Sequence, residues 1–244
     1  MFASLKKVFW TDVTVAQVDG GFQIRLDQRP LKTPEKSPLI LPERGLADAV
    51  AAEWRAQTGE IDPTGMPFTR LANAAIDKMP EQTPAVIDIL AAYGETDLVC
   101  HRATGPDALV AQQAAAWDPV MAWAAKEHDL RLIVTAGVIP VDQPRATLDR
   151  IAAFVGAHRS FSLMALHDLV MISGSFILAF AVAKRHLDAV DAWPLSRIDE
   201  DWQAAQWGID ADAAAAAAAK REDFLRAAEL YHFVRPDGAM TRNQ

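Results

Sequence analysis

The sequence FSLMALHDLVMISGSFILAFAVAKR, at residues 161–185, is the most apolar part of the chain. Between positions 163 and 183 its only clearly polar side chains are His167, Asp168, Ser173 and Ser175. A helical segment that is apolar on every face is either a membrane span or the centre of a helical domain. A span needs about 20 consecutive apolar residues, whereas the run over 169–183 is shorter and is cut at Gly174. We therefore predict a buried helix or helix pair, with Gly174 at a break or a close helix contact and Ser175 capping the second piece.

The composition is typical of a folded globular protein. Of the 244 residues, 51% are hydrophobic and 23% are charged, which excludes a disordered chain and allows one large domain or two moderate ones. The net charge of −8 argues against nucleic acid or an anionic membrane as a partner. Residues 1–80 carry ten basic and ten acidic side chains, so the imbalance lies entirely in residues 81–244, with fourteen and twenty-two.

Cysteine use and the N-terminus bear on the compartment. The single cysteine, Cys100, excludes an internal disulfide and indicates a reducing compartment. The pair Lys6-Lys7 is not followed by an apolar leader, nor by an amphipathic Arg- and Ser-rich one. We therefore expect a soluble protein that stays in the compartment where it is made and has no membrane insertion.

The N-terminal part predicts a small sheet covered by a helix. Residues 8–31 show two alternating runs around Asp19-Gly20-Gly21, which is a strong hairpin signal. A short strand is expected over 39–41, and a helix over 43–58 that ends at Gly59. Thr69 is the expected cap of a further helix over 70–79. The helix over 43–58 places four apolar residues on one face: Leu46, Val50, Ala51 and Trp54.

After residue 80 the pattern is almost entirely helical. Strand signals remain only at 97–102, which could pair with the hairpin sheet, and at 130–134. Pro119 and Pro194 should kink or split their helices, and Asp210 should cap an exposed helix that carries the alanine run 213–219. The fold class is thus α+β, with an N-terminal domain over 1–80 and a larger all-α domain over 81–244. The expected helices are 82–93, 106–127, 144–157, 162–186, 188–207 and 210–234.

The residue types that could carry catalysis do not form a recognisable set. His167 and Asp168 are neighbours on a helix and point about 100° apart, so we read them as a satisfied core or boundary pair rather than a dyad. Cys100 is interpreted as a small core hydrophobe. The histidines have no metal-ligand spacing, and no phosphate loop or dinucleotide fingerprint occurs in the sequence. No cofactor and no metal are expected.

The segment LSRIDEDWQAAQWGI, at residues 195–209, carries the best candidate for a binding surface. Helical spacing assigns one stripe to packing, formed by Leu195, Ile198, Trp202, Ala205 and Ile209. Glu200, Gln203 and Trp207 share a second stripe, and Asp199 and Gln206 lie on another flank. The alternative for the acidic residues is a solvated helix face. A large aromatic residue beside carboxylates and amides favours a partner-binding face for the second stripe.

These residues belong to a wider set of short motifs whose order resembles one family over nearly the whole chain. The sequence is similar to the assembly chaperones that escort the alpha subunit of the F-type ATP synthase. The matching motifs are RPLKTP at 29–34, Glu53-Trp54, TRLANAAID at 69–77, ETDL at 95–98, Gln113 with Trp117-Asp118-Pro119, Gly174-Ser175, and DEDWQ at 199–203 followed by Gln206-Trp207-Gly208.

The resemblance implies a non-enzymatic chaperone with a mixed N-terminal domain and a helical C-terminal domain. It implies binding of the unassembled alpha subunit, without ATP, on the surface that the beta subunit later takes. Its location would be the bacterial cytoplasm, equivalent to the mitochondrial matrix. The family's functional acidic residues fall on Asp199, Glu200 and Asp201. Together with Gln203 and Trp207 of the second stripe, these are the expected partner-binding residues.

Three further residues are expected to be structural: Trp54, Gly174 and Trp202. We expect a monomer. Two alternatives remain open: an enzyme with a small-molecule pocket at the domain junction, and an interaction module that stays in a stable complex.

Overall fold

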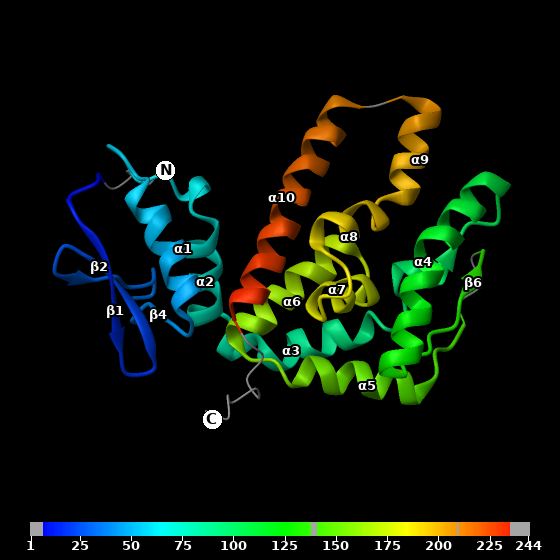
Figure 1. Cartoon of the computed structure of the whole chain (residues 1–244), viewed down its shortest axis with the longest axis horizontal. Helices are drawn as coiled ribbons and strands as arrows, with labels where there is room; N and C mark the ends of the chain where they lie inside the picture. The colour runs from blue at the N-terminus through cyan, green and yellow to red at the C-terminus, as the bar shows by residue number, and fades with distance from the viewer. Residues whose placement is uncertain (1–6, 138–140, 209, 235–244) are drawn as a thin grey trace. The chain divides into compact units, whose positions relative to one another are not determined.

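The computed structural model describes residues 7–137, 141–208 and 210–234, and its element order is shown in Figure 1. These residues form two compact units. The first comprises the described residues up to Thr83, together with Arg159–Ala165 and the end of the chain from Glu229, and the second comprises Pro84–His158 and Leu166–Ala228. The first unit contains an antiparallel sheet and the second is mainly helical, so the predicted α+β class is confirmed.

The sheet of the first unit is built on the predicted hairpin. Strand β1 (Val13–Val18) pairs antiparallel with β2 (Gly21–Leu26), and β2 also pairs with the short strands β3 (Arg29–Pro30) and β4 (Ile40–Leu41). Gly21 has φ 147°, and a Cβ at this position would collide with the carbonyl group of Leu41. Only glycine therefore lets β4 approach the start of β2 this closely.

Two helices lie entirely within the first unit, and both differ from prediction at one end. Helix α1 (Arg44–Arg55) packs against β1 and β2 but ends before the expected Gly59. Helix α2 (Pro67–Asp77), which follows the 3₁₀ turn η1 (Pro63–Gly65), contains Thr69 in its first turn, so Thr69 is not its cap. The buried carboxylate of Glu53 takes that role, accepting from the backbone N–H groups of Phe68 at 2.6 Å and Thr69 at 2.8 Å.

The helices of the described residues after Thr83 follow the predicted order, with two corrections. Strand β5 (His101–Arg102) pairs in parallel with β6 (Thr135–Ala136) and not with the hairpin sheet, and β6 begins just after the expected strand at 130–134. Pro119 does not split its helix: α4 continues through it, with Trp117 and Val120 buried close to the proline. The bounds are α3 (Met79–Ala92), η2 (Leu98–Cys100), α4 (Asp107–His128), α5 (Arg145–Gly156), α6 (Ser160–Ser173), α7 (Phe176–Ala183), α8 (Ala189–Leu195), α9 (Ile198–Trp207) and α10 (Ala211–Phe233).

The apolar stretch forms the predicted helix pair. Gly174, at φ 69°, separates α6 from α7, and every residue over 176–182 is buried. The Ser175 hydroxyl accepts from the backbone N–H of Leu178 at 3.0 Å, so Ser175 caps α7 as predicted. Helix α7 packs against α4 and α8. Among the helices in the described part of the chain, none has the length and hydrophobicity that crossing a membrane requires.

Candidate functional site

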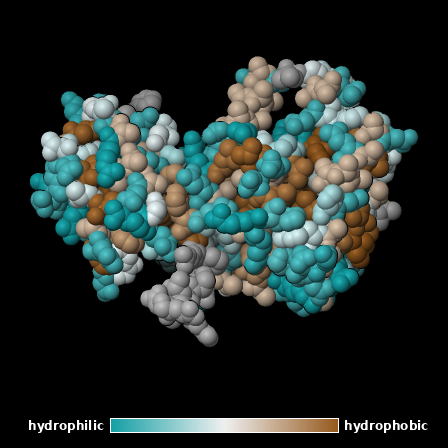
Figure 2. All heavy atoms as spheres, viewed as in Figure 1, coloured by the Kyte–Doolittle hydropathy of each residue, from teal (hydrophilic) through white to brown (hydrophobic). Residues whose placement is uncertain are grey.

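A groove between α9 and α10 brings together most of the predicted binding residues. All the residues that line it belong to the second unit. The groove has a volume of about 690 Å³, and Figure 2 shows the hollow between these two helices. We call it the α9–α10 groove. Its polar wall is formed by Arg197, Glu200, Asp201, Gln203, Asp210 and Lys220, and its small apolar lining by Ala204, Ala213, Ala214, Ala216 and Ala217, with Trp207 and Gly208 at the turn.

Local sequence explains why the chain turns back on itself here. Three acidic residues occupy the first turn of α9, where the helix dipole favours negative charge. Gly208, at φ 97°, ends α9 in a conformation that other residues rarely adopt. Two residues later Asp210 starts α10 by accepting from the backbone N–H of Ala213 at 2.8 Å. The predicted cap and the exposed alanine helix are therefore both confirmed.

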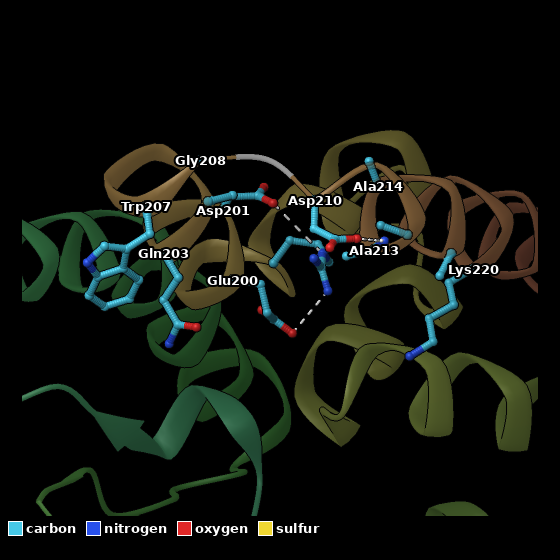
Figure 3. Close-up of a pocket in the computed structure, with 13 residues that line it drawn as sticks. Glu200, Asp201, Gln203, Trp207, Gly208, Asp210, Ala213, Ala214 and Lys220 are labelled. Carbon is cyan, nitrogen blue, oxygen red and sulfur yellow. Dashed lines mark hydrogen bonds and ion pairs between the residues drawn. The ribbon is translucent and has the colours of Figure 1, made fainter.

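The charges of the groove are paired with one another. Arg197 donates from Nη1 to Glu200 Oε1 at 3.0 Å, and its Nε lies 3.9 Å from Asp201 Oδ1; Figure 3 draws both interactions. The Glu200 and Asp201 side chains remain 52% and 63% exposed, so these pairs contribute little to stability. Both carboxylates can therefore accept further hydrogen bonds from a basic group that enters the groove.

Trp207 is the most exposed large hydrophobic residue of the described chain. It is 82% exposed at the end of α9, and in Figure 3 its indole projects away from the ribbon beside Gln203. An exposed tryptophan next to a small apolar surface is the residue type that most often anchors a protein partner.

Asp199 is placed differently from the other predicted binding residues and does not line the groove. It is half-buried and accepts from Gln113 Nε2 at 2.6 Å, while Gln113 Oε1 accepts from the backbone N–H of Ala103 at 2.9 Å. Gln113 is 1% exposed on α4. Nearby, Trp117 Nε1 donates to the Leu195 carbonyl at 2.8 Å. Asp199 therefore fastens α9 to α4.

The predicted packing stripe of this segment is correct only in part. Ile198 is buried, Leu195 and Trp202 are half-buried, and Ala205 is exposed. Ile209 lies outside the described residues. The predicted stripe assumed one continuous helix. In the structure α8 ends just after Pro194 and α9 begins at Ile198, so a single helical period does not run through residues 195–209. The split predicted at Pro194 is confirmed.

The other residues predicted to be structural have clear surroundings. Trp54 is half-buried, with its ring centroid 5.2 Å from that of Trp10, and its Nε1 is buried without a hydrogen-bond partner. The Gly174 carbonyl accepts from the backbone N–H of Leu98 at 3.2 Å.

The expectation that the His167 and Asp168 side chains point apart is wrong, because His167 Nδ1 lies 3.0 Å from Asp168 Oδ1. They form a satisfied boundary pair, as predicted.

The sequence did not reveal the buried carboxylate of Asp97. It is 0% exposed and accepts from Ser175 Oγ at 2.6 Å and from the backbone N–H of Ile177 at 2.9 Å. Burial raises the pKa of Asp97 to about 6, and these hydrogen bonds counteract that rise. Burial also raises the pKa of the Cys100 thiol to about 12, with the charge of Asp97 adding to it, so Cys100 is the core residue that was predicted. No group of three metal-ligating side chains occurs within the described ranges.

An open groove with paired charges and an exposed tryptophan is the kind of surface with which one protein binds another. Comparison with known proteins agrees. The family model described as ATP12 chaperone protein matches residues 7–125. The mitochondrial protein atp12 of Schizosaccharomyces pombe is 26% identical over 217 residues, which covers 84% of this chain and 75% of that protein.

Solved structures extend the match over nearly the whole chain. The crystal structure of Atp12 from Paracoccus denitrificans has a TM-score of 0.91 at 46% identity and covers 94% of this chain and 98% of that one. A variant of the same protein, in which one aspartate is replaced by lysine, gives 0.91 at 45% identity with the same coverage. The chain belongs to the ATP12 chaperone family, which confirms the resemblance found in the sequence. The family is named for chaperones, not enzymes, so the enzyme alternative is set aside.

Proposed function

We propose that this protein is an ATP-independent assembly chaperone that binds the unassembled alpha subunit of the F-type ATP synthase. It shields the subunit interface of the alpha subunit until the beta subunit replaces it. Membership of the ATP12 chaperone family supports the chaperone part of this function. A subunit that waits for its partner exposes a large apolar surface, and such a surface promotes aggregation.

The observation that carries the proposal is the composition of the α9–α10 groove. Four of the five residues expected to bind the partner lie on it: Glu200, Asp201, Gln203 and Trp207. Trp207 supplies an apolar anchor, and the two carboxylates supply a negative rim for a basic group on the alpha subunit. The fifth residue, Asp199, positions α9 through Gln113.

The pairing of the groove charges also suits release without ATP. A basic group of the partner competes with Arg197 for Glu200 and Asp201, and Arg197 returns to these carboxylates when the partner leaves. Glu200 and Asp201 then have a cationic partner in both states, so neither state leaves an isolated carboxylate. The beta subunit can therefore replace this protein on the alpha subunit if it offers the alpha subunit a larger complementary surface.

Co-expression with the alpha subunit tests this function. The fraction of alpha subunit that stays soluble should rise when this protein is present, and the assembled ATP synthase should contain none of it. An alpha subunit that is equally insoluble with and without this protein would contradict the proposal. Retention in the finished enzyme would instead favour the alternative of a permanent interaction module.

A further inference from the structure

A second cavity lies away from the α9–α10 groove, at the end of α4 in the second unit. Its volume is about 220 Å³. This is below the roughly 300–1,000 Å³ of pockets that enclose drug-sized ligands, so it suits a group about the size of one amino-acid residue. We call it the Lys184 pocket. One side is apolar, formed by Leu130, Ala153, Phe154 and Phe180, and the other is basic, formed by His128, Arg150 and Lys184.

The apolar side is held in place by edge-to-face aromatic packing. The Phe154 and Phe180 rings have centroids 4.8 Å apart at an interplanar angle of 80°. The His128 ring meets Phe180 edge-on, with a centroid separation of 4.8 Å and an angle of 90°. Phe180 is 3% exposed. Since the rings already pack against one another, an apolar group can bind here without ordering the wall first.

The two cations of the pocket differ in their partners. Arg150 is held by an ion pair with Asp129 Oδ2 at 2.5 Å. Lys184 lies over aromatic rings instead, with its Nζ 5.0 Å from the Phe154 centroid and 5.5 Å from the Phe180 centroid. No carboxylate among the described residues lies within ion-pair distance of Lys184. Lys184 is exposed, so its hydrated ammonium group is free to pair with an anion.

His128 adds a polar group that does not strengthen this charge. Burial, and then the nearby charge of Lys184, lower the pKa of His128. The imidazole is consequently neutral near pH 7 and can donate one hydrogen bond. The pocket thus combines Lys184, which has no ion-pair partner among the described residues, Arg150, which shares Asp129 with Arg131, one neutral polar ring and an aromatic wall.

We propose that the Lys184 pocket binds an apolar group that bears a single carboxylate, with the carboxylate facing Lys184 and the apolar part against Phe154 and Phe180. Arg150 is already held by Asp129, so the carboxylate is placed at Lys184 and not at Arg150. The same chemistry is offered by a free aromatic carboxylic acid and by the C-terminal residue of a polypeptide. The inference is independent of the α9–α10 groove, since the two sites share no residue.

Titration with 3-phenylpropionate, followed by calorimetry and by ligand-observed NMR, tests the proposal. We expect the wild type to bind it about two- to fivefold more tightly than the neutral analogue 3-phenylpropanol, which lacks the ion pair with the exposed Lys184. Lys184→Met should weaken the affinity for 3-phenylpropionate by the same factor, and Lys184→Arg should retain most of the wild-type affinity. The matched control is Lys126→Met, because Lys126 is an exposed lysine of α4 that does not line the pocket. It should bind like the wild type.

Peptides distinguish the two sources of the ligand. A short peptide ending in phenylalanine is compared with the same peptide carrying an amidated C-terminus. Preference for the free carboxylate peptide over 3-phenylpropionate assigns the pocket to a polypeptide end, and the reverse assigns it to a small acid. The proposal is overturned if acid and alcohol bind equally, if Lys184→Met binds the acid like the wild type, or if the wild type binds none of the probes at millimolar concentration.

Discussion

The Ser175 hydroxyl joins two elements of the second unit, and its removal should measurably destabilise the protein. It caps α7 by accepting from the Leu178 N–H at 3.0 Å, and it donates to the buried Asp97 carboxylate at 2.6 Å. Loss of a serine cap costs about 0.5–2 kcal/mol. Asp97 keeps backbone donors such as the Val99 N–H at 3.1 Å, but a hydrogen bond to a charged group contributes about 1.5–3 kcal/mol. Both hydrogen bonds use the Ser175 hydroxyl, so Ser175→Ala removes both at once. We therefore expect this substitution to lower the free energy of unfolding by about 2–4 kcal/mol.

Thermal unfolding followed by circular dichroism is the assay. For a protein of this size about 1 kcal/mol corresponds to 2–4 °C, so the Tm should fall by about 4–16 °C. Ser173→Ala is the matched control. Ser173 is also buried and lies two residues away. Its hydroxyl donates to backbone carbonyls such as that of Leu169 at 2.7 Å and accepts from the Ser175 backbone N–H at 3.3 Å, but it contacts no carboxylate. We expect a smaller loss of Tm for this control, and one that does not depend on the ionisation of Asp97.

The pH dependence separates the carboxylate contact from the cap. The pKa of Asp97 is raised to about 6 in the folded state, so its contribution to stability is largest below the unfolded value near 4 and is lost as pH rises through about 6. The Ser175 hydrogen bond opposes this loss, and Ser175→Ala should therefore be more destabilising at pH 8 than at pH 5. Equal Tm losses at both pH values, or a loss no larger than that of Ser173→Ala, would refute the reasoning.

Three shorter predictions concern residues outside this contact. Trp54→Ala should reduce stability by less than about 3 kcal/mol, because Trp54 is only half-buried against Trp10, and should leave partner capture intact; melts with a parallel pull-down check this. Asp199→Ala should lower the Tm by removing the acceptor of the buried Gln113 amide, and an unchanged Tm would show that Asp199 does not fasten α9. Cys100, whose thiol pKa is raised to about 12 by burial, should react with a thiol reagent at pH 8 only after denaturant is added; rapid labelling of the native protein would contradict its placement.

Much of the fold followed from local sequence because composition and short-range pattern determine it. The apolar stretch around Gly174 had to be buried whichever helices surrounded it, and Ser175 was in place to cap its second half. The hairpin was predictable because a glycine-rich turn separates two alternating runs. The existence of α9 and α10 and the cap at Asp210 were likewise local features.

Contacts between segments distant in sequence could not be predicted in the same way. Helical spacing shows which residues share a face, but it does not show which segment lies opposite that face. Asp199 meets Gln113 across 86 positions, and Glu53 caps α2 across 16. The pairing of β5 with β6 has the same long-range character. The local sequence pattern consequently places Asp97 at the start of a strand, although its carboxylate is buried against Ser175 and Ile177.

The most direct test of the proposed function is the amount of alpha subunit that co-purifies with groove variants. Glu200→Lys reverses a charge on the groove wall, and Trp207→Ala removes its exposed aromatic ring. Glu222→Lys is the control, because Glu222 has a similarly exposed side chain, 53% against 52%, in an ion pair with a neighbouring arginine, but does not line the groove.

All three variants should unfold at the wild-type Tm, since exposed ion pairs contribute only about 0–1 kcal/mol. We expect the affinity for the alpha subunit to fall at least about tenfold for Glu200→Lys and Trp207→Ala, and to stay at the wild-type level for Glu222→Lys. Wild-type capture by both groove variants, with their folding intact, would contradict the assignment of the α9–α10 groove as the site that holds the alpha subunit.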